Sequence, residues 1–588
     1  MKLNSISTKR FLAVIQFALI AIWIANLADT EAYFITYALC AASAVACLLD
    51  NYNHNREIGV FGKVIGAMLA VLFGLIIVMA NYGLFQIIRD PNMVSAGTNK
   101  LLNLINAALT FLGGAVAAWN VLRWMFSRIP FELEFVFRPR KQPVRVFLGV
   151  FVAIAAINLV YHFFVIYPGT LTLDSLSQLE QIRDGIYSNH HPFWHTMVIK
   201  VCVEIGYLLF GDVNQAVSVY SVVQILMMAA CFAYVIMTLY QAGVPRLWMV
   251  LSFAVYAFLP YNIAYSSTMW KDVLFGGAVC VFLTAMYRIL KQISKKQLWD
   301  YVVFAVSGIG FCVWRSNGFL ALVAAFFVFL ITLWKDHKKL LLVLFGVIVA
   351  GWVMKGPVLD TMNVAEPDLV ESLSIPVQQV ARVIVDGGEL TQEEYELLDM
   401  VMDVERVPEL YQSHISDNIK NEIRRKDNAY FEANTGQFFT LWLNLLKRYP
   451  VTYVQAWVDQ TKGYWGGGYY NWIYAQFVNE NDMGLALAEK NGIVATLFWN
   501  YFGLVRNVNL FQPLHSIGLH TWLLAIFCVA NFLKKRREWL LSVPLLMIIL
   551  TLMVATPVAA EFRYAYAIFT AFPLVACVSL YGRPEKEM

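Results

Sequence analysis

The chain has 588 residues, of which 59% are hydrophobic and only 14% are charged, and its mean hydropathy is +0.59. Soluble globular domains carry about a quarter of charged residues, so this composition excludes an ordinary soluble protein. The formal net charge is only +4, and the Lys and Arg residues lie in short loops rather than on one basic face, which argues against nucleic acid as a partner.

Apolar stretches of about 20 residues recur along the chain, and each is long enough to cross a bilayer as a helix. We therefore predict an all-α polytopic membrane protein with about fourteen transmembrane helices. In chain order the predicted spans are 11–29, 31–49, 62–86, 101–122, 145–166, 214–240, 246–265, 272–290, 298–314, 317–334, 339–356, 514–533, 538–556 and 563–581.

The basic loops between these spans set the predicted orientation in the plasma membrane, because cytoplasmic loops carry an excess of Lys and Arg. With both termini inside, every basic cluster falls on the cytoplasmic side, whereas one missed span would place half of them outside. The clusters are Lys9 and Arg10; Arg138, Arg140, Lys141 and Arg145; Lys291, Lys295 and Lys296; Lys335, Lys338 and Lys339; and Lys534 to Arg537.

The stretch 194–211 is apolar but contains Lys200 and Glu204, one helical turn apart. Counting it as a span would move Arg246 and the later basic loops to the outside. We therefore predict an amphipathic helix that lies on the outer membrane surface, in contact with membrane lipids.

The chain divides into four predicted parts. Residues 1–130 form an N-terminal module of four spans, and a basic, Pro-containing linker at 126–144 leads into a core that occupies 131–357. An outer-face region at 358–513 is mainly helical, with helical patterns near 390–430 and 436–462, and it includes an aromatic and glycine segment at 464–470. Residues 514–588 hold three further spans.

Asp174 lies a few residues after the fifth predicted span, in the sequence Pro-Gly-Thr-Leu-Thr-Leu-Asp-Ser. One interpretation is structural, since Asp is a good N-cap and a surface helix would then begin at Ser175. The other is chemical, since an acid held at a membrane boundary can act as a general base or as a metal ligand. The two interpretations are compatible.

Gln178 and three of the nine histidines, His190, His191 and His195, follow in the same outer loop. His191 and His195 would share one face of a helix that starts near Pro192, and with a carboxylate they could bind a divalent metal. Alternatively they contact a sugar or phosphate, or they face the headgroups in a structural role. We predict Gln178 and the histidines as substrate-binding residues.

Further ionisable residues stand at the outer ends of later spans. Lys271 follows Trp270 and could be an interfacial anchor, but Asp272 is costly at the start of an apolar helix unless it has a function. Arg315 lies between two outer helix ends, where a guanidinium could bind a phosphate or reach the headgroups.

Three more candidates come from the later part of the chain. Glu561 and Arg563 open the last span from outside, and they could pair with each other or meet a lipid phosphate. Arg382 follows a Gln-Gln pair in the outer region, where it could bind substrate or belong to a solvated helix face.

Together these residues resemble the GT-C superfamily of membrane glycosyltransferases, which use polyprenyl-phosphate-linked sugars. In that family a span leads to an outer loop with an early acid, followed by surface helices with a His-Pro-type start and an apolar-Phe-Gly end. Two spans later a second outer loop carries another acid. The matching residues here are Asp174, His191-Pro192, Phe210-Gly211 and Asp272.

The resemblance implies a GT-C-like core of about seven spans in 145–357, interfacial helices, a large outer region and extra spans, the type A plan. The N-terminal module lies outside that plan. The Asp-x-Glu pair of the oligosaccharyltransferase branch is missing, because Val273 and Leu274 follow Asp272, and this argues against protein N-glycosylation.

The resemblance also implies a reaction. The donor's lipid phosphate would lie near Lys271, Arg315 and Arg563. Asp174 would act as general base on an acceptor hydroxyl, or would hold a divalent ion (Mg, Mn or Zn) jointly with Asp272. The sugar would pass with inversion to a glycan, lipid or protein acceptor on the outer face.

Two other functions are compatible with the sequence. One is a transporter or flippase for a lipid-linked glycan, although transporters usually place polar residues at the bilayer midplane. The other is a non-catalytic scaffold of a surface-polymer assembly complex, in which alanine at Asp174 would leave function intact.

Overall fold

A computed structural model describes residues 2–27, 34–54, 57–82, 100–130, 142–293, 297–466, 477, 481–488 and 492–581. Several sequence predictions fall on residues outside these ranges. They are the middle of the linker with Arg138, Arg140 and Lys141, the basic residues Lys295 and Lys296, and the aromatic and glycine segment beyond Gly466.

The described residues form helices joined by short connections, with isolated bridges but no sheet, which confirms the all-α prediction. Twelve helices in this part of the chain are long and apolar enough to cross a membrane, or up to 13 if the bent pair α10–α11 counts as one span. The protein is therefore a multi-pass membrane protein.

Every predicted span coincides with a helix, but the predicted number is higher because three of these helices are short or broken. Two helices, α13 and α24, have 17 residues each. The predicted span 246–265 bends by 50° between Phe258 and Pro260, where the proline ring cannot continue the preceding helix.

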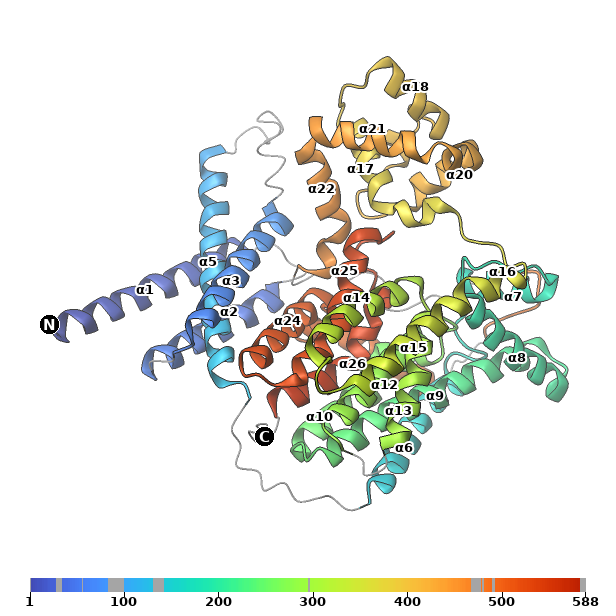
Figure 1. The fold of residues 1–588 in the computed structure, drawn as a ribbon, viewed down its shortest axis with the longest axis horizontal. Helices are drawn as coiled ribbons and strands as arrows, with labels where there is room; N and C mark the ends of the chain where they lie inside the picture. Colours follow the sequence, from blue (N-terminus) through green and yellow to red (C-terminus); the bar gives the residue numbers. More distant parts are fainter. Residues whose placement is uncertain are drawn as a thin grey trace.

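The N-terminal module packs on the C-terminal helices (Figure 1). Its α3 contributes Phe61 and Phe73, whose rings meet those of Phe532 and Trp522 on α24. The module comprises α1 (Lys2–Asn26), α2 (Phe34–Asn53), α3 (Val60–Tyr82) and α5 (Lys100–Arg128), and the C-terminal helices are α24 (Ile517–Leu533), η4 (Arg537–Leu541), α25 (Ser542–Ala555) and α26 (Phe562–Leu580).

The core gathers around α12 and also holds α26, and 83% and 78% of their apolar stretches are buried. These two helices approach closely because a Cβ at Gly276 would lie 2.9 Å from the Tyr566 ring. The core helices are α6 (Pro143–Phe164), α7 (Leu173–Asp184), α8 (Phe193–Phe210), α9 (Val213–Gln241), α10 (Arg246–Phe258), α11 (Pro260–Ser266), α12 (Lys271–Leu290), α13 (Gln297–Val313), α14 (Ser316–Leu333), α15 (Lys338–Lys355) and α16 (Pro357–Thr361).

Helix α8, the predicted interfacial helix, is long and apolar enough to be one of the twelve candidate spans. It nevertheless crosses α9 obliquely. Its His195 bonds to Tyr220 and its Gly206 lies against Ala216, so about 16 Å along α8 correspond to only about 6 Å along α9 at 1.5 Å per residue. An antiparallel pair of parallel-axis spans would match these distances, so α8 and α9 are inclined to each other; the interfacial placement of α8 stays a prediction.

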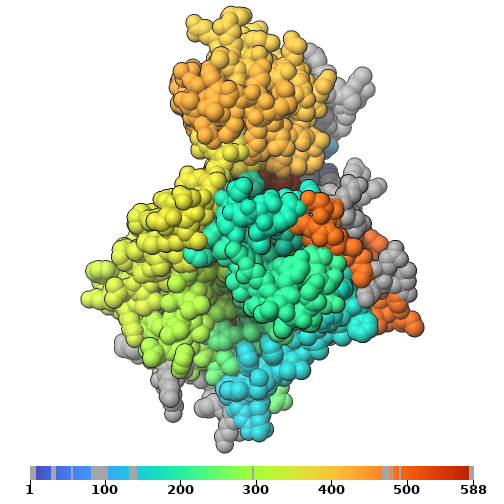
Figure 2. All heavy atoms as spheres, turned by 90° about the vertical axis from the view of Figure 1, so that its right-hand side faces the viewer, coloured from blue at the N-terminus to red at the C-terminus, as the bar shows by residue number. Residues whose placement is uncertain are grey.

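The predicted outer region contains two different parts. The first, here named the outer unit, has its own apolar core, which includes Val377, Leu398 and Ile423, and Figure 2 shows most of it projecting beyond the membrane helices. It comprises η1 (Leu369–Leu373), α17 (Ser374–Val385), α18 (Gln392–Val401), α19 (Val407–Leu410), α20 (Asp417–Ala433), α21 (Thr435–Arg448) and α22 (Pro450–Thr461).

The second part returns to the core. Here α23 (Ile493–Asn507) packs Phe498 and Phe502 on Tyr161 of α6. Two short turns flank this part, η2 (Lys462–Tyr464) and η3 (Asn509–Leu514).

Candidate functional site

The two outer loops singled out in the sequence are joined by backbone hydrogen bonds. The Thr170 amide donates to the Ser267 carbonyl at 2.8 Å, and the Met269 amide donates to the Thr170 carbonyl at 3.0 Å. The Trp270 indole donates to the Thr172 hydroxyl at 2.9 Å. These bonds hold the start of α7 against the start of α12.

Asp174 occupies the first turn of α7 but does not cap it. The helix begins at Leu173 with Thr172 as N-cap, and the Thr172 amide donates to the Ser175 hydroxyl at 3.0 Å. The predicted N-cap at Asp174 is therefore wrong. Because Thr172 and Ser175 satisfy the helix end, the Asp174 carboxylate is available for other contacts.

Two cations from distant parts of the chain contact Asp174. Its carboxylate accepts a hydrogen bond from Arg563 Nη1 at 2.8 Å and lies 3.9 Å from Lys271 Nζ. Lys271 donates in turn to Nδ1 of His191 at 3.1 Å. Arg563 Nε lies 3.5 Å from Glu561. The structure thus brings together five of the predicted site residues.

A third cation, Arg315, lies beside this group. It forms an ion pair with Asp272, whose side chain is fully buried. The Arg315 guanidinium also lies 4.6 Å from the centroid of the Tyr564 ring, and Arg563 lies 5.2 Å from the same ring. Arg563 lies over the Trp270 ring as well, at 4.8 Å. These aromatic rings fix the cations by cation–π contacts.

Burial and the neighbouring charges shift the pKa values of these groups. Burial alone would raise the pKa of Asp174, but the charges of Lys271 and Arg563 outweigh it and hold that pKa well below its usual range. Burial, helped by Lys271, lowers the pKa of His191 to about 3, so this imidazole is neutral and accepts from the lysine. Burial raises the pKa of Glu561 to about 7.

The site is partly open to solvent. The exposed fraction of the side chain is 26% for Asp174 and 18% for both Lys271 and Arg563. A ligand can therefore reach these groups, while the surrounding protein still strengthens their electrostatic interactions.

Two predicted substrate-binding residues have a different role. His195 is fully buried, and its ring hydrogen-bonds Gln178 at 3.0 Å and the Tyr220 hydroxyl at 2.7 Å. The Gln178 amide donates to Thr196 at 2.8 Å. Their polar atoms are engaged inside the protein, so the contacts of Gln178 and His195 support a structural role and do not support the prediction that they bind substrate.

This network continues to the turn that carries the site. The Tyr220 hydroxyl donates to Gln224 at 2.8 Å. The Gln224 amide then donates to three carbonyls of the turn before Lys271, those of Tyr265, Ser266 and Thr268, at 3.1, 3.0 and 2.8 Å. The histidine and the two glutamines therefore hold the turn that positions Lys271 and Asp272.

Replacing Gln224 with leucine is expected to lower the free energy of unfolding by about 1–3 kcal/mol, because three buried carbonyls and the Tyr220 hydroxyl lose their partner. Thermal unfolding of the detergent-purified protein measures this. Gln215→Leu, at an exposed position on the same helix, should leave the midpoint unchanged. Equal midpoints for both variants would contradict the positioning role.

The outer unit reaches the edge of the site beside His190. The Asn189 and Ala365 amides donate to the Ala365 and Tyr187 carbonyls at 2.8 and 3.0 Å, which aligns the segment before η1 with the histidine loop. The exposed ring of His190 lies 4.8 Å from that of His191. The sequence did not predict this contact between the outer unit and the histidine loop, since a backbone pairing between distant segments leaves no local pattern in the sequence.

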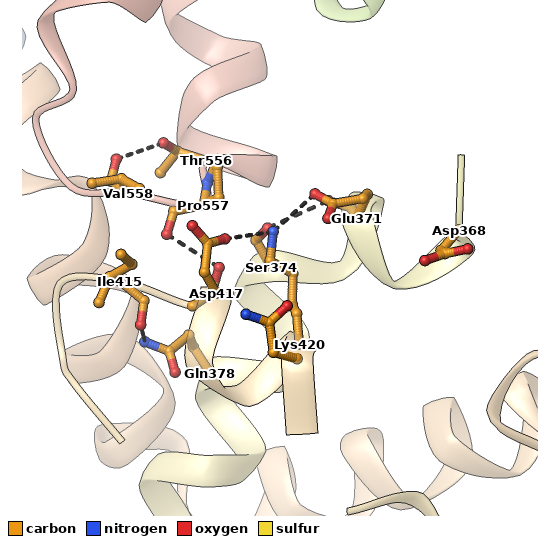
Figure 3. Close-up of polar contacts among 12 residues, drawn as sticks. Asp368, Glu371, Ser374, Gln378, Ile415, Asp417, Lys420, Thr556, Pro557 and Val558 are labelled. Atoms are coloured by element: carbon orange, nitrogen blue, oxygen red, sulfur yellow. Dashed lines mark hydrogen bonds and ion pairs between the residues drawn. The ribbon is translucent and has the colours of Figure 1, made fainter. Parts of the chain in front are cut away.

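The outer unit also holds the loop 556–561, which leads into Glu561 and Arg563. The Ser416 amide donates to the Pro557 carbonyl at 2.9 Å, and the Ala559 amide donates to the His414 carbonyl at 2.8 Å. Figure 3 shows this loop beside the turn that begins α20. The position of the last helix end thus depends on the outer unit.

A buried lysine fixes this part of the outer unit. Lys420 is only 1% exposed and forms ion pairs with Glu371 of η1 at 2.9 Å and with Asp417 at 2.8 Å (Figure 3). Burial alone would raise the pKa of Glu371, but its pairing with Lys420 and Arg424 lowers that pKa to about 2. The triad joins η1 to α20 behind the loop 556–561.

Arg382 has local partners. Its guanidinium donates to Asp386 at 3.0 Å and to Asp459 at 3.2 Å, both of which belong to the outer unit. The structure gives Arg382 a role in joining α17 to α22, so the prediction that it binds substrate is not supported by its contacts.

The residues present do not fit the expected divalent metal. Asp174 and Asp272 are each paired with a guanidinium. Among the residues that the structure describes, no group of three or more His, Cys, Asp and Glu side chains is arranged to hold a metal ion.

Fold and site define a multi-pass helical membrane protein with an ionic site at one end of its most enclosed helices. The chain belongs to the DUF6020 family, a family of unknown function whose model matches residues 182–587. A search of curated proteins found no match, and a search of solved structures found none either.

Proposed function

We propose that this chain is a membrane glycosyltransferase that moves a sugar from a polyprenyl-phosphate donor to an acceptor hydroxyl on the outer face. One observation carries the proposal. Lys271, Arg315 and Arg563 converge at the starts of α12, α14 and α26, where they form a partly open site of the kind that binds a lipid phosphate.

The opposite helix ends support the outer location of this site. Lys291, just beyond the far end of α12, pairs with Glu538 at 3.2 Å. Arg537 pairs with Asp336 at 2.7 Å. The basic loops therefore meet at the end of the bundle away from the site, as expected if they are cytoplasmic. Ionisable groups at helix ends also favour an enzyme over a transporter with a midplane site.

The geometry supports a sequence of steps. The donor phosphate competes with Asp174 for Arg563 and Lys271, so donor binding frees the Asp174 carboxylate. The acceptor oxygen then attacks the sugar C1 as the bond from C1 to the phosphate oxygen breaks, with inversion. The cations stabilise the charge on the departing phosphate, and the freed carboxylate stabilises the oxocarbenium-like charge at C1.

In the structure, where Arg563 and Lys271 are paired with it, Asp174 is a weak base, since these two cations lower its pKa. The expected effect of Asp174→Asn is therefore electrostatic. We expect kcat to fall by about 10²-fold, because the carboxylate no longer stabilises C1. We expect the donor KM to fall as well, since an anion that competes with the phosphate has been removed.

The test uses purified protein in detergent with a panel of synthetic polyprenyl-phosphate hexoses and pentoses, alkyl glycosides as acceptors, and release of polyprenyl phosphate as readout, with and without chelator. Asp184→Asn, at an exposed position at the end of α7, is the matched control. Equal kcat for wild type and Asp174→Asn would contradict this role. Movement of labelled donor across liposomes without bond cleavage would overturn the proposal in favour of a flippase.

A further inference from the structure

Three acids meet the cations of the site, and they are not equally paired. Asp272 is paired with Arg315, and Asp174 with both Arg563 and Lys271. Glu561 lies 3.5 Å from the Nε of Arg563, which is beyond the usual range of an N–H···O hydrogen bond. Because Arg563 directs Nη1 at Asp174, the negative charge of Glu561 is the least neutralised of the three carboxylates.

Glu561 is nevertheless held firmly in place. It is the N-cap residue of α26, its side chain is 8% exposed, and its carbonyl accepts from the Tyr564 amide at 3.2 Å. The preceding Ala560 packs so tightly on Gly463 that a Cβ at the glycine would lie 2.1 Å from the Ala560 side chain. The carboxylate therefore stays at the inner edge of the site.

The groups that face Glu561 come from four elements. They are Arg563 and Tyr564 of α26, Asp174 of α7, Arg315 before α14 and Tyr464 of η2. Burial raises the pKa of Glu561 to about 7, while the positive charge of Arg563 opposes the shift only in part. A general base works best when its pKa is near the working pH.

We propose that Glu561 is the general base of the transfer, an assignment that rests on the proposed function. As the acceptor oxygen bonds to the sugar C1, its proton passes to a Glu561 carboxylate oxygen. The bond from C1 to the phosphate oxygen breaks, and polyprenyl phosphate leaves with the electron pair. Glu561 then returns the proton to water.

The first test is the pH dependence of kcat/KM for Glu561→Gln and wild type, with the donor panel and alkyl glycosides named above. Wild type should show an ascending limb with an apparent pKa near 7. Glu561→Gln should lose about 10²–10⁴-fold in kcat and should lose the limb, with donor KM little changed. Asp174→Asn should keep the limb, and Glu396→Gln, at an exposed position on α18, should behave as wild type.

The outcomes separate this assignment from the proposed function. Wild type that turns over no donor contradicts the proposed function. Active wild type together with a Glu561→Gln variant that is less than tenfold slower, and that keeps the limb, contradicts the role of Glu561 alone.

The second test needs no turnover. Glu561 binds its proton more tightly in the folded state than in the unfolded state, so its contribution to stability is present at acidic pH. That contribution is lost as the pH rises from the ordinary value of 4.5 to about 7. The thermal midpoint of wild type should fall over this window relative to that of Glu561→Gln. Parallel curves for the two proteins would show that Glu561 is ionised throughout and would overturn the assignment.

Discussion

Replacing Arg563 with alanine is expected to reduce sugar transfer by about 10³-fold, because removal of one preorganised donor from a developing anion costs about this much. Arg563 acts in two ways in the proposed reaction. It holds Asp174 at 2.8 Å in the resting state, and it is one of the three cations that meet the departing phosphate.

Replacing Arg563 with lysine tests whether the guanidinium group is needed in addition to its charge. Arg563→Lys keeps the charge but cannot donate to Asp174 while also lying flat over the Trp270 ring, so it should restore only part of the activity. Arg506→Ala, at an exposed position on α23, is the control. Release of polyprenyl phosphate measures the effect, and Arg563→Ala with activity within tenfold of wild type would exclude the phosphate role.

The largest effect on stability is expected for Arg315→Ala. Asp272 is fully buried, and its partner in the structure is the Arg315 guanidinium. Removal of one member of a buried ion pair leaves an uncompensated charge and costs about 3–5 kcal/mol. Unfolding in mixed detergent micelles should therefore show a clear loss for this variant.

A double variant separates stability from chemistry. Asp272→Asn combined with Arg315→Met removes both charges, and neutral replacements of a buried pair are often tolerated. It should recover most of the lost stability but little of the transfer activity, because a phosphate-binding cation is still missing. An Arg315→Ala single variant as stable as wild type would show that the pair is solvated.

The membrane helices could be predicted from the sequence because the hydropathy of a single stretch of about 20 residues is enough to identify a span. Each predicted span coincides with a helix. The number of spans was overestimated where a helix is short or broken, as at Pro260, which bends one predicted span. The outer helices near 390–430 and 436–462 were likewise visible as patterns, whereas their separate apolar core depends on contacts that a linear pattern does not encode.

The candidate site was predictable to a different extent. Asp174, Lys271 and Arg563 were identified since charged groups at a membrane boundary are costly without a function. Gln178 and His195 are polar residues at the same membrane boundary, but they hydrogen-bond Thr196 and Tyr220 inside the protein. Sequence alone cannot separate these cases, because a polar residue that binds a ligand and one that binds a neighbouring helix look alike.

The convergence of α12, α14 and α26 has a consequence beyond the side chains. All three helices direct their N-termini at the site, since Lys271, Ser316 and Phe562 are their first residues. The aligned peptide dipoles place partial positive charge there, together with amide groups that lack intrahelical partners. The backbone itself therefore attracts an anion, and variants that lack a single cationic side chain should retain a residual affinity for phosphate that only unwinding these helix ends would remove.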